Sequence, residues 1–111
     1  MLRLLALTVC LAFGPALAHD SWISRGGHRN AAGEWCCGAG DCALLDARAV
    51  GLTSRGYAVD GAGTIEGTGE REHYREIVPE AEAMPSPDGA YWRCKRPDGS
   101  RRCFFAPPPN T

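Results

Sequence analysis

Five cysteines follow residue 18 of this 111-residue chain, and their spacing limits the thiol chemistry that the sequence can carry. An odd number allows at most two disulfides within a chain and leaves one thiol, which could join two chains in a disulfide-linked dimer. The spacing lacks the Cys-x-x-Cys pair of thiol oxidoreductases and the paired knuckles of zinc sites. Structural disulfides are therefore favoured, and a thiol-redox function is the third of three hypotheses. The five are Cys36, Cys37, Cys42, Cys94 and Cys103.

A histidine at the start of the mature chain would provide a second chemistry. Cleavage after Ala18 would make His19 the first residue, whose α-amine and imidazole together can chelate Cu(II). His28 or His73 could then supply a third nitrogen, in the tetragonal nitrogen geometry that suits this ion. Exported polysaccharide monooxygenases and periplasmic copper carriers use a first-residue histidine in this way, and the chain is similar to them at this residue. A periplasmic copper-binding protein is the alternative hypothesis of function.

Basic residues gather near the end of the chain, and acidic residues gather before them. The stretch from Asp60 to Glu82 contains seven acidic residues and two arginines. The chain without residues 1–18 has a net charge of −2. Either these acids neutralise the basic residues, or an outside anion such as a lipid headgroup or an anionic envelope polymer binds them. A mildly acidic exported chain is not expected to bind nucleic acid. The five bases of this anion-contact hypothesis are Arg93, Lys95, Arg96, Arg101 and Arg102.

Catalytic motifs are not apparent in the sequence. The glycines at 61, 63, 67 and 69 are not followed by the Lys-Ser/Thr of a phosphate loop, and no nucleophile–base constellation stands out. We therefore predict no catalytic residues and no cofactor other than the copper alternative. A binding or structural role is favoured over an enzyme.

The first 18 residues have the features of a signal peptide. Arg3 precedes an apolar run over residues 4–13, and Ala16-Leu17-Ala18 is an A-x-A cleavage site. The run is about half the ~20 residues that a membrane-spanning helix needs, so no transmembrane anchor is expected. The sequence predicts cleavage after Ala18 and a periplasmic or secreted protein, where disulfides persist.

The composition of the remaining 93 residues predicts one small domain over residues 19–106. Only 18 of them are large apolar residues, whereas 20 are glycine or proline, so the core needs disulfides to support it. We predict a mainly β, disulfide-stapled domain of short antiparallel strands and hairpins with an irregular N-terminal region. A proline-rich tail covers residues 107–111.

Local patterns predict several short elements before the final hairpin. Asp60-Gly61 is a hairpin signal between two β segments, and the charged stretch 71–78 suits either an exposed helix or a strand limited to its last three residues. We favour the strand. The expected elements are a strand at 43–45, a helical turn at 47–50, β segments at 57–59 and 64–65, and a strand at 76–78.

The final hairpin joins strands at 91–96 and 101–105 through Pro97-Asp98-Gly99-Ser100. A symmetric register places Cys94 opposite Cys103 and predicts a disulfide between them. Of the other three cysteines, we expect Cys36 or Cys37 to pair with Cys42, in preference to a strained vicinal Cys36–Cys37 bridge.

The same symmetric register would set Arg96 opposite Arg101 and Lys95 opposite Arg102. A three-residue loop with a bulge is the alternative, and it would set Lys95 against Arg101. We favour the symmetric register because it gathers the apolar side chains.

The chain resembles a group of small, exported, cysteine-containing alphaproteobacterial proteins of unassigned function. The resemblance covers most of the chain after residue 18, and it implies export and disulfides but no catalytic residues. The elements that carry it are His19-Asp20, Cys36-Cys37 with Asp41-Cys42, Ser86-Pro87-Asp88-Gly89, and Arg102-Cys103 followed by Phe104-Phe105 and prolines.

Overall fold

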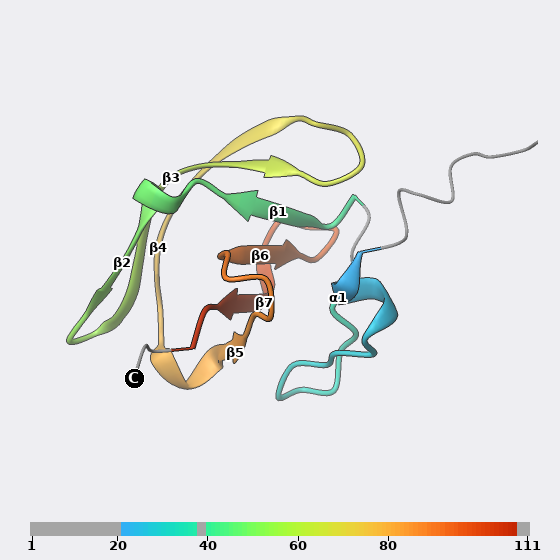
Figure 1. Cartoon of the computed structure of the whole chain (residues 1–111), viewed down its shortest axis with the longest axis horizontal. Helices are drawn as coiled ribbons and strands as arrows, with labels where there is room; N and C mark the ends of the chain where they lie inside the picture. Colours follow the sequence, from blue (N-terminus) through green and yellow to red (C-terminus); the bar gives the residue numbers. More distant parts are fainter. Residues whose placement is uncertain (1–20, 38–39, 109–111) are drawn as a thin grey trace, which may run out of the picture.

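A single curled β-sheet forms most of the protein (Figure 1). The computed structural model describes residues 21–37 and 40–108. The expected mainly β, disulfide-stapled fold is confirmed. Its elements are α1 (Trp22–Arg25), β1 (Cys42–Leu45), η2 (Ala47–Ala49), β2 (Val50–Thr53), β3 (Gly56–Ile65), β4 (Arg71–Val78), η3 (Glu80–Glu82), β5 (Ala83–Pro85), β6 (Trp92–Lys95) and β7 (Arg101–Ala106).

The long strand β3 organises one half of the sheet. Strands β1 and β2 follow one another along one edge of β3, and β4 pairs with its other edge over eight residues. Beyond β1 the order is β6, β7 and β5, with β5 parallel to β7 and the other pairs antiparallel. The sheet curls, so that β4 passes beside β6 and β7 on its way to η3 and β5 (Figure 1).

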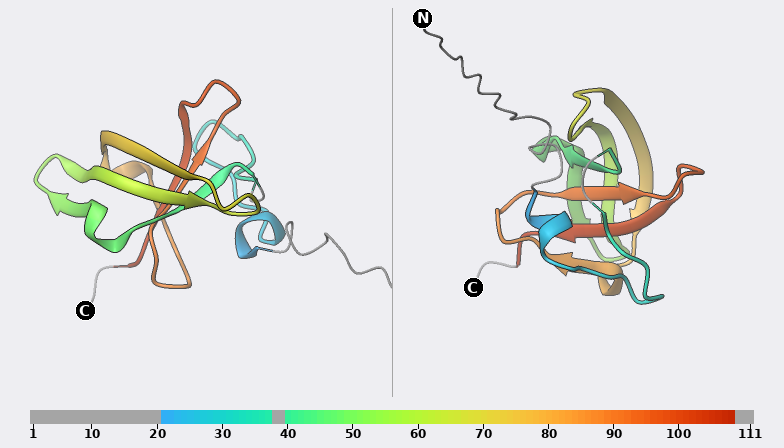
Figure 2. Two further views of the ribbon diagram at one scale, coloured as in Figure 1. Left: turned by 90° about the horizontal axis from the view of Figure 1, so that it is seen from above. Right: turned by 90° about the vertical axis from the view of Figure 1, so that its right-hand side faces the viewer.

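Each face of the β1–β6–β7 region has its own core, because side chains alternate between the faces of a strand. The N-terminal segment 21–37 covers one face, with α1 lying against β6 and β7 (Figure 2). Its core consists of Ile23, Cys36, Cys42, Trp92, Cys94, Cys103 and Phe105. The concave face encloses Leu45, Tyr57, Val59, Val78, Phe104 and Ala106.

A shared carboxylate fastens the N-terminal segment to the sheet. The indole N–H groups of Trp22 and Trp92 both donate to Asp88 Oδ2, each at 2.9 Å. Burial by itself raises the pKa of the Asp88 carboxyl, but these donors and the backbone N–H of Ala90 hold the pKa below its usual range. The N-terminal region is thus largely irregular, as predicted, but it includes one helical turn and is firmly attached.

Strand β3 is continuous, so the predicted hairpin at Asp60-Gly61 is wrong. Gly61 lies where a Cβ atom would approach the Cβ of Ala49 in η2 to 2.6 Å. The glycine therefore permits close packing of η2 on β3 and makes no turn there. The strand predicted at 76–78 is the end of the longer β4, and the helical alternative for 71–78 is wrong because β3 pairs along this whole stretch.

The final hairpin combines the two registers that the sequence allows. Cys94 faces Cys103, as the symmetric register predicts, but a bulge after Cys94 sets Lys95 opposite Arg101. The backbone N–H of Arg96 donates to Ser100 O across a three-residue turn. The predicted Arg96–Arg101 and Lys95–Arg102 pairs are therefore wrong.

The structure contains the predicted two disulfides and one free thiol, but the predicted Cys94–Cys103 pairing is wrong. Cys42 bonds to Cys94 across β1 and β6, where their Cα atoms are 3.9 Å apart. Cys36 bonds to Cys103, so the expected pairing of Cys42 with Cys36 or Cys37 is also wrong. The reason is that β6 pairs with β1 as well as with β7, and the sequence of the hairpin does not show that second pairing. Cys37 is the free, exposed cysteine of the described residues.

Candidate anion-binding site

Three of the five bases of the anion-contact hypothesis lie under β4, in contact with its inward-facing acids. Glu76 accepts hydrogen bonds from Arg93 Nε and Arg101 Nη1, both at 2.7 Å. Lys95 Nζ lies 3.1 Å from Glu72 Oε2. The Arg93 side chain is only 8% exposed. The acids of the chain therefore neutralise these three bases.

Tyr74 connects the two acids of this network. Its hydroxyl donates to Glu72 Oε1 at 2.7 Å, and the Arg93 guanidinium lies 4.6 Å from its ring centroid. Burial, together with the Glu72 carboxylate, raises the pKa of Tyr74. The hydrogen bonds from Tyr74 and Lys95 lower the pKa of Glu72.

A fourth base, Arg96, pairs with Glu34 of the N-terminal segment. The two side chains form two hydrogen bonds, of 2.9 and 2.6 Å. The hydrogen bonds from Arg96 and Asn30 lower the pKa of Glu34 to about 2. Arg96 is thus neutralised by a residue outside the acidic stretch that the sequence suggested.

Arg102 differs from the other four bases because no carboxylate of the described residues lies within ion-pair distance of it; Glu34, which is paired with Arg96, interacts with Arg102 only at longer range. Its Nη1 donates to the backbone carbonyl of Trp35 at 3.2 Å. Its Nε is buried without a hydrogen-bond partner. The hairpin bulge accounts for this position, since bulges redirect side chains, and Arg102 contacts the N-terminal segment whereas Arg101 contacts β4.

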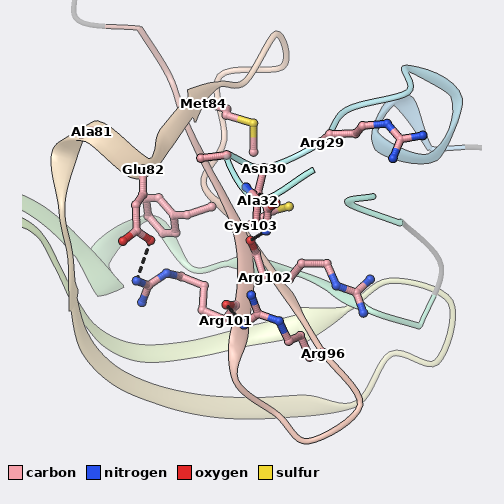
Figure 3. Close-up of a pocket in the computed structure, with 12 residues that line it drawn as sticks. Arg29, Asn30, Ala32, Ala81, Glu82, Met84, Arg96, Arg101, Arg102 and Cys103 are labelled. Carbon is pink, nitrogen blue, oxygen red and sulfur yellow. Dashed lines mark hydrogen bonds and ion pairs between the residues drawn. The ribbon is translucent and has the colours of Figure 1, made fainter. Parts of the chain in front are cut away.

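Arg102 lines an open hollow of about 630 Å³ beside the first half of β7 (Figure 3). Strand β5 pairs with β7 only from Phe104 onward, so within the described chain no strand covers this side of residues 101–103. We call this site the Arg102 hollow. It is lined by Arg29, Asn30, Ala31, Ala32, Ala81, Glu82, Met84, Arg96, Arg101, Arg102, Cys103 and Phe104.

Asn30 fixes the loop that forms one wall of the Arg102 hollow. Its Nδ2 donates to the Arg102 carbonyl and to Glu34 Oε1, both at 2.8 Å. Its Oδ1 accepts the backbone N–H groups of Ala32 and Glu34. One side chain therefore holds the loop closed and covers a backbone acceptor at the edge of β7.

Positive charge exceeds negative charge around the Arg102 hollow. Arg101 bonds to Glu82 at 2.8 Å as well as to Glu76. Arg29 stacks on Trp35, with its guanidinium 4.0 Å from the ring centroid, and donates to the Gly33 carbonyl. Among the described residues, Arg29 and Arg102 are the two arginines of the lining without a carboxylate at ion-pair distance, so the site is suited to an anion.

Sequence reasoning did not identify Asn30, Arg29 or the η3 residues as part of a site. The Asn30-Ala31-Ala32-Gly33 stretch does carry a turn signal, but its contact with Arg102 spans 72 residues. Such a contact follows from the tertiary fold and cannot be read from local sequence.

The histidines of the copper alternative lie on different elements. His28 packs between the rings of Trp22 and Phe105, with centroids 5.3 and 5.5 Å away. His73 lies on β4, 3.9 Å from Asp60. Within residues 21–37 and 40–108, no three His, Cys, Asp or Glu side chains are grouped to hold a metal ion. His19 lies outside the described residues, as does the predicted signal peptide.

Comparisons with known proteins give no further indication of function. No protein-family model, curated protein or solved structure matches the chain. The described part of the chain also contains no helix with the length and hydrophobicity required to cross a bilayer. A function has therefore to be inferred from the residues of the chain itself.

Proposed function

We propose that this protein is a small exported binding domain that holds an anionic group in the Arg102 hollow. The observation that carries the proposal is the Arg102 guanidinium, which lines the hollow and has no carboxylate partner among the described residues. Its Nε is buried, so the Nη atoms are the donors that an anion in the hollow could reach. A partly buried charge without a carboxylate at ion-pair distance is costly, and a bound anion would offset that cost.

Arginine is well suited to this role because its planar guanidinium presents several donors in a fixed geometry. Such a fork matches a carboxylate or a phosphate and forms short, charge-assisted hydrogen bonds. Arg29 also lines the hollow and has no carboxylate within ion-pair distance among the described residues, but its guanidinium stacks on Trp35 and lies away from that of Arg102 (Figure 3). The site thus combines a donor group with a favourable local potential.

The charge pairing favours a discrete anion over a lipid surface or an extended envelope polymer. Four of the five hairpin bases already have carboxylate partners within the chain, so no broad basic surface is left for a polymer. The anion-contact hypothesis is thereby narrowed from a five-residue patch to the surroundings of Arg102.

Export is part of the proposal and rests on the sequence of residues 1–18 together with the two disulfides. Disulfides persist on the oxidising side of a membrane and are rare in reducing compartments. N-terminal sequencing of the protein recovered outside the cytoplasm should begin at His19. A different first residue would refute cleavage after Ala18 and exclude the copper chelate at His19.

The binding experiment compares the wild-type protein with Arg102→Gln and with a control of equal charge, Arg55→Gln. Arg55 is exposed in the turn between β2 and β3 and does not line the hollow. Acetate and inorganic phosphate are titrated separately at low ionic strength, where surface electrostatics are strongest. Binding is followed by the backbone amide NMR signals of the residues that line the hollow, which all three proteins retain, and in the wild type also by the arginine Nε–H signals.

We expect saturable binding that shifts the Arg102 Nε–H signal and weakens at least about tenfold in Arg102→Gln, since hydrogen bonds to charged groups contribute ~1.5–3 kcal/mol. Arg55→Gln should bind within about twofold of the wild type, because it removes only a screened, distant charge. If both variants lost the same affinity, binding would depend only on net charge, and the proposed site at Arg102 would be refuted. Failure of the wild type to bind either anion would refute the proposal.

A further inference from the structure

The Arg102 hollow has an apolar wall as well as a charged one. Met84 and the alanines 31, 32 and 81 contribute aliphatic surface to it, and Met84 is only partly exposed. Figure 3 shows Ala81 and Met84 at one end of the hollow, and Arg96 and Arg102 at the other. An inorganic anion would use only the second end.

The volume is also larger than a simple anion needs. About 630 Å³ lies within the range of ~300–1,000 Å³ typical of sites for organic ligands. Such sites are mostly apolar and use a few polar groups to orient the ligand. Here the polar groups are the guanidinium of Arg102 and its neighbours.

The Arg101–Glu82 ion pair closes one side of the hollow between these two ends. Arg101 is 17% exposed and bonds to two carboxylates, Glu76 and Glu82, so its charge is already compensated. A ligand with a second anionic group would meet Glu82 near the apolar end. The arrangement therefore suits one anionic group attached to an uncharged body.

We infer that the ligand is a small organic acid with one carboxylate and a short apolar body, with the carboxylate at Arg102 and the body against Met84 and Ala81. This inference rests on the proposed anion-binding function and specifies its ligand class. Removing a methylene group from water contributes enough to strengthen binding by about fourfold when burial is complete. Partial burial in an open hollow strengthens binding less than that.

The test titrates the wild-type protein with acetate, butyrate, hexanoate and octanoate, with inorganic phosphate as the anion without a body. We expect affinity to rise by about twofold to fourfold per methylene along the series, and phosphate to bind no better than acetate. Affinity that stays constant along the series, or phosphate binding tighter than octanoate, would overturn the inference. In both cases the proposed function would stand, whereas absence of binding by every anion would refute that function.

Two variants locate the apolar body within the site. Met84→Gln keeps the side-chain length but makes the wall polar, so it should weaken octanoate several-fold more than it weakens acetate. Ala81→Asn should act in the same direction, and it keeps the test valid if Met84→Gln disturbs the adjacent core. Leu52→Gln is the control, since Leu52 is 57% exposed on β2 and away from the hollow. The placement of the apolar body would be contradicted if Leu52→Gln lost as much octanoate affinity as Met84→Gln and Ala81→Asn. It would also be contradicted if these two variants lost as much affinity for acetate as for octanoate.

Discussion

Replacing Glu76 with glutamine should destabilise the protein strongly, because one carboxylate serves two arginines. Arg93 and Arg101 both bond to Glu76, and their side chains are only 8% and 17% exposed. A glutamine offers one carbonyl acceptor, and its amide N–H₂ would face the second guanidinium. Breaking a buried ion pair costs ~3–5 kcal/mol. We take the lower end, about 3 kcal/mol, since Arg101 keeps its bond to Glu82.

Urea unfolding followed by tryptophan fluorescence measures this loss, because Trp92 on β6 is buried in the core under the N-terminal segment and Trp22 of α1 packs against that core. A loss of ~3 kcal/mol is a large share of the ~5–15 kcal/mol free energy of unfolding typical of a folded domain. The urea midpoint should therefore fall clearly, while the dependence of the free energy of unfolding on urea concentration stays the same. Asp46→Asn is the matched control: it breaks an ion pair with Arg71 in which both side chains are about half exposed. It should change the midpoint far less. If Glu76→Gln loses less than about 1 kcal/mol, the pair behaves like an exposed one and the reasoning is refuted.

Three further outcomes are expected. The pKa of Glu34 is lowered from 4.5 to about 2, so its stabilising effect is present above pH 4.5 and is lost as the pH falls toward 2. In Glu34→Gln the free energy of unfolding should therefore depend less on pH between 4.5 and 2, and an unchanged pH dependence would contradict the Arg96 pairing. Replacing Cys42 and Cys94 with serine should lower the free energy of unfolding, measured in urea, by about 4 kcal/mol, because the bridge spans 52 residues. Non-reducing peptide mapping of the wild type should show the Cys36–Cys103 and Cys42–Cys94 peptides and no Cys94–Cys103 peptide. Gly61→Ala should lower the free energy of unfolding, measured by thermal denaturation, by ~1–3 kcal/mol through the clash with Ala49. Gly51→Ala should not, because a Cβ atom at that position meets open space.

The features that the sequence predicted correctly depend on neighbouring residues. The strand at Ala43–Leu45, the helical turn after Asp46 and the final hairpin all follow from local alternation and turn residues. The hairpin register beyond the bulge was also predictable, because apolar residues and cysteines had to share one face.

The features that were missed depend on a third element. The disulfide partners of Cys94 and Cys103 come from β1 and the N-terminal segment, which no hairpin argument includes. Gly61 suggested a turn, but its small size is required by the packing of η2. The Arg102 hollow could not be predicted because its walls come from segments about 50 and 70 residues apart, joined by the contact of Asn30 with the Arg102 carbonyl.

The disulfide connectivity also constrains the order in which the protein can be completed. Synthesis starts at the N-terminus, so Cys36, Cys37 and Cys42 are made long before their two partners, which lie 52 and 67 residues further on. During that interval the three early thiols can react with one another or with Cys10, but not with their native partners. Native bridging must wait for β6 and β7, the last strands of the sheet, and non-local pairing of this kind slows folding. If a premature bridge such as Cys37–Cys42 forms in an oxidising compartment, thiol–disulfide exchange must break it before the native pair can form.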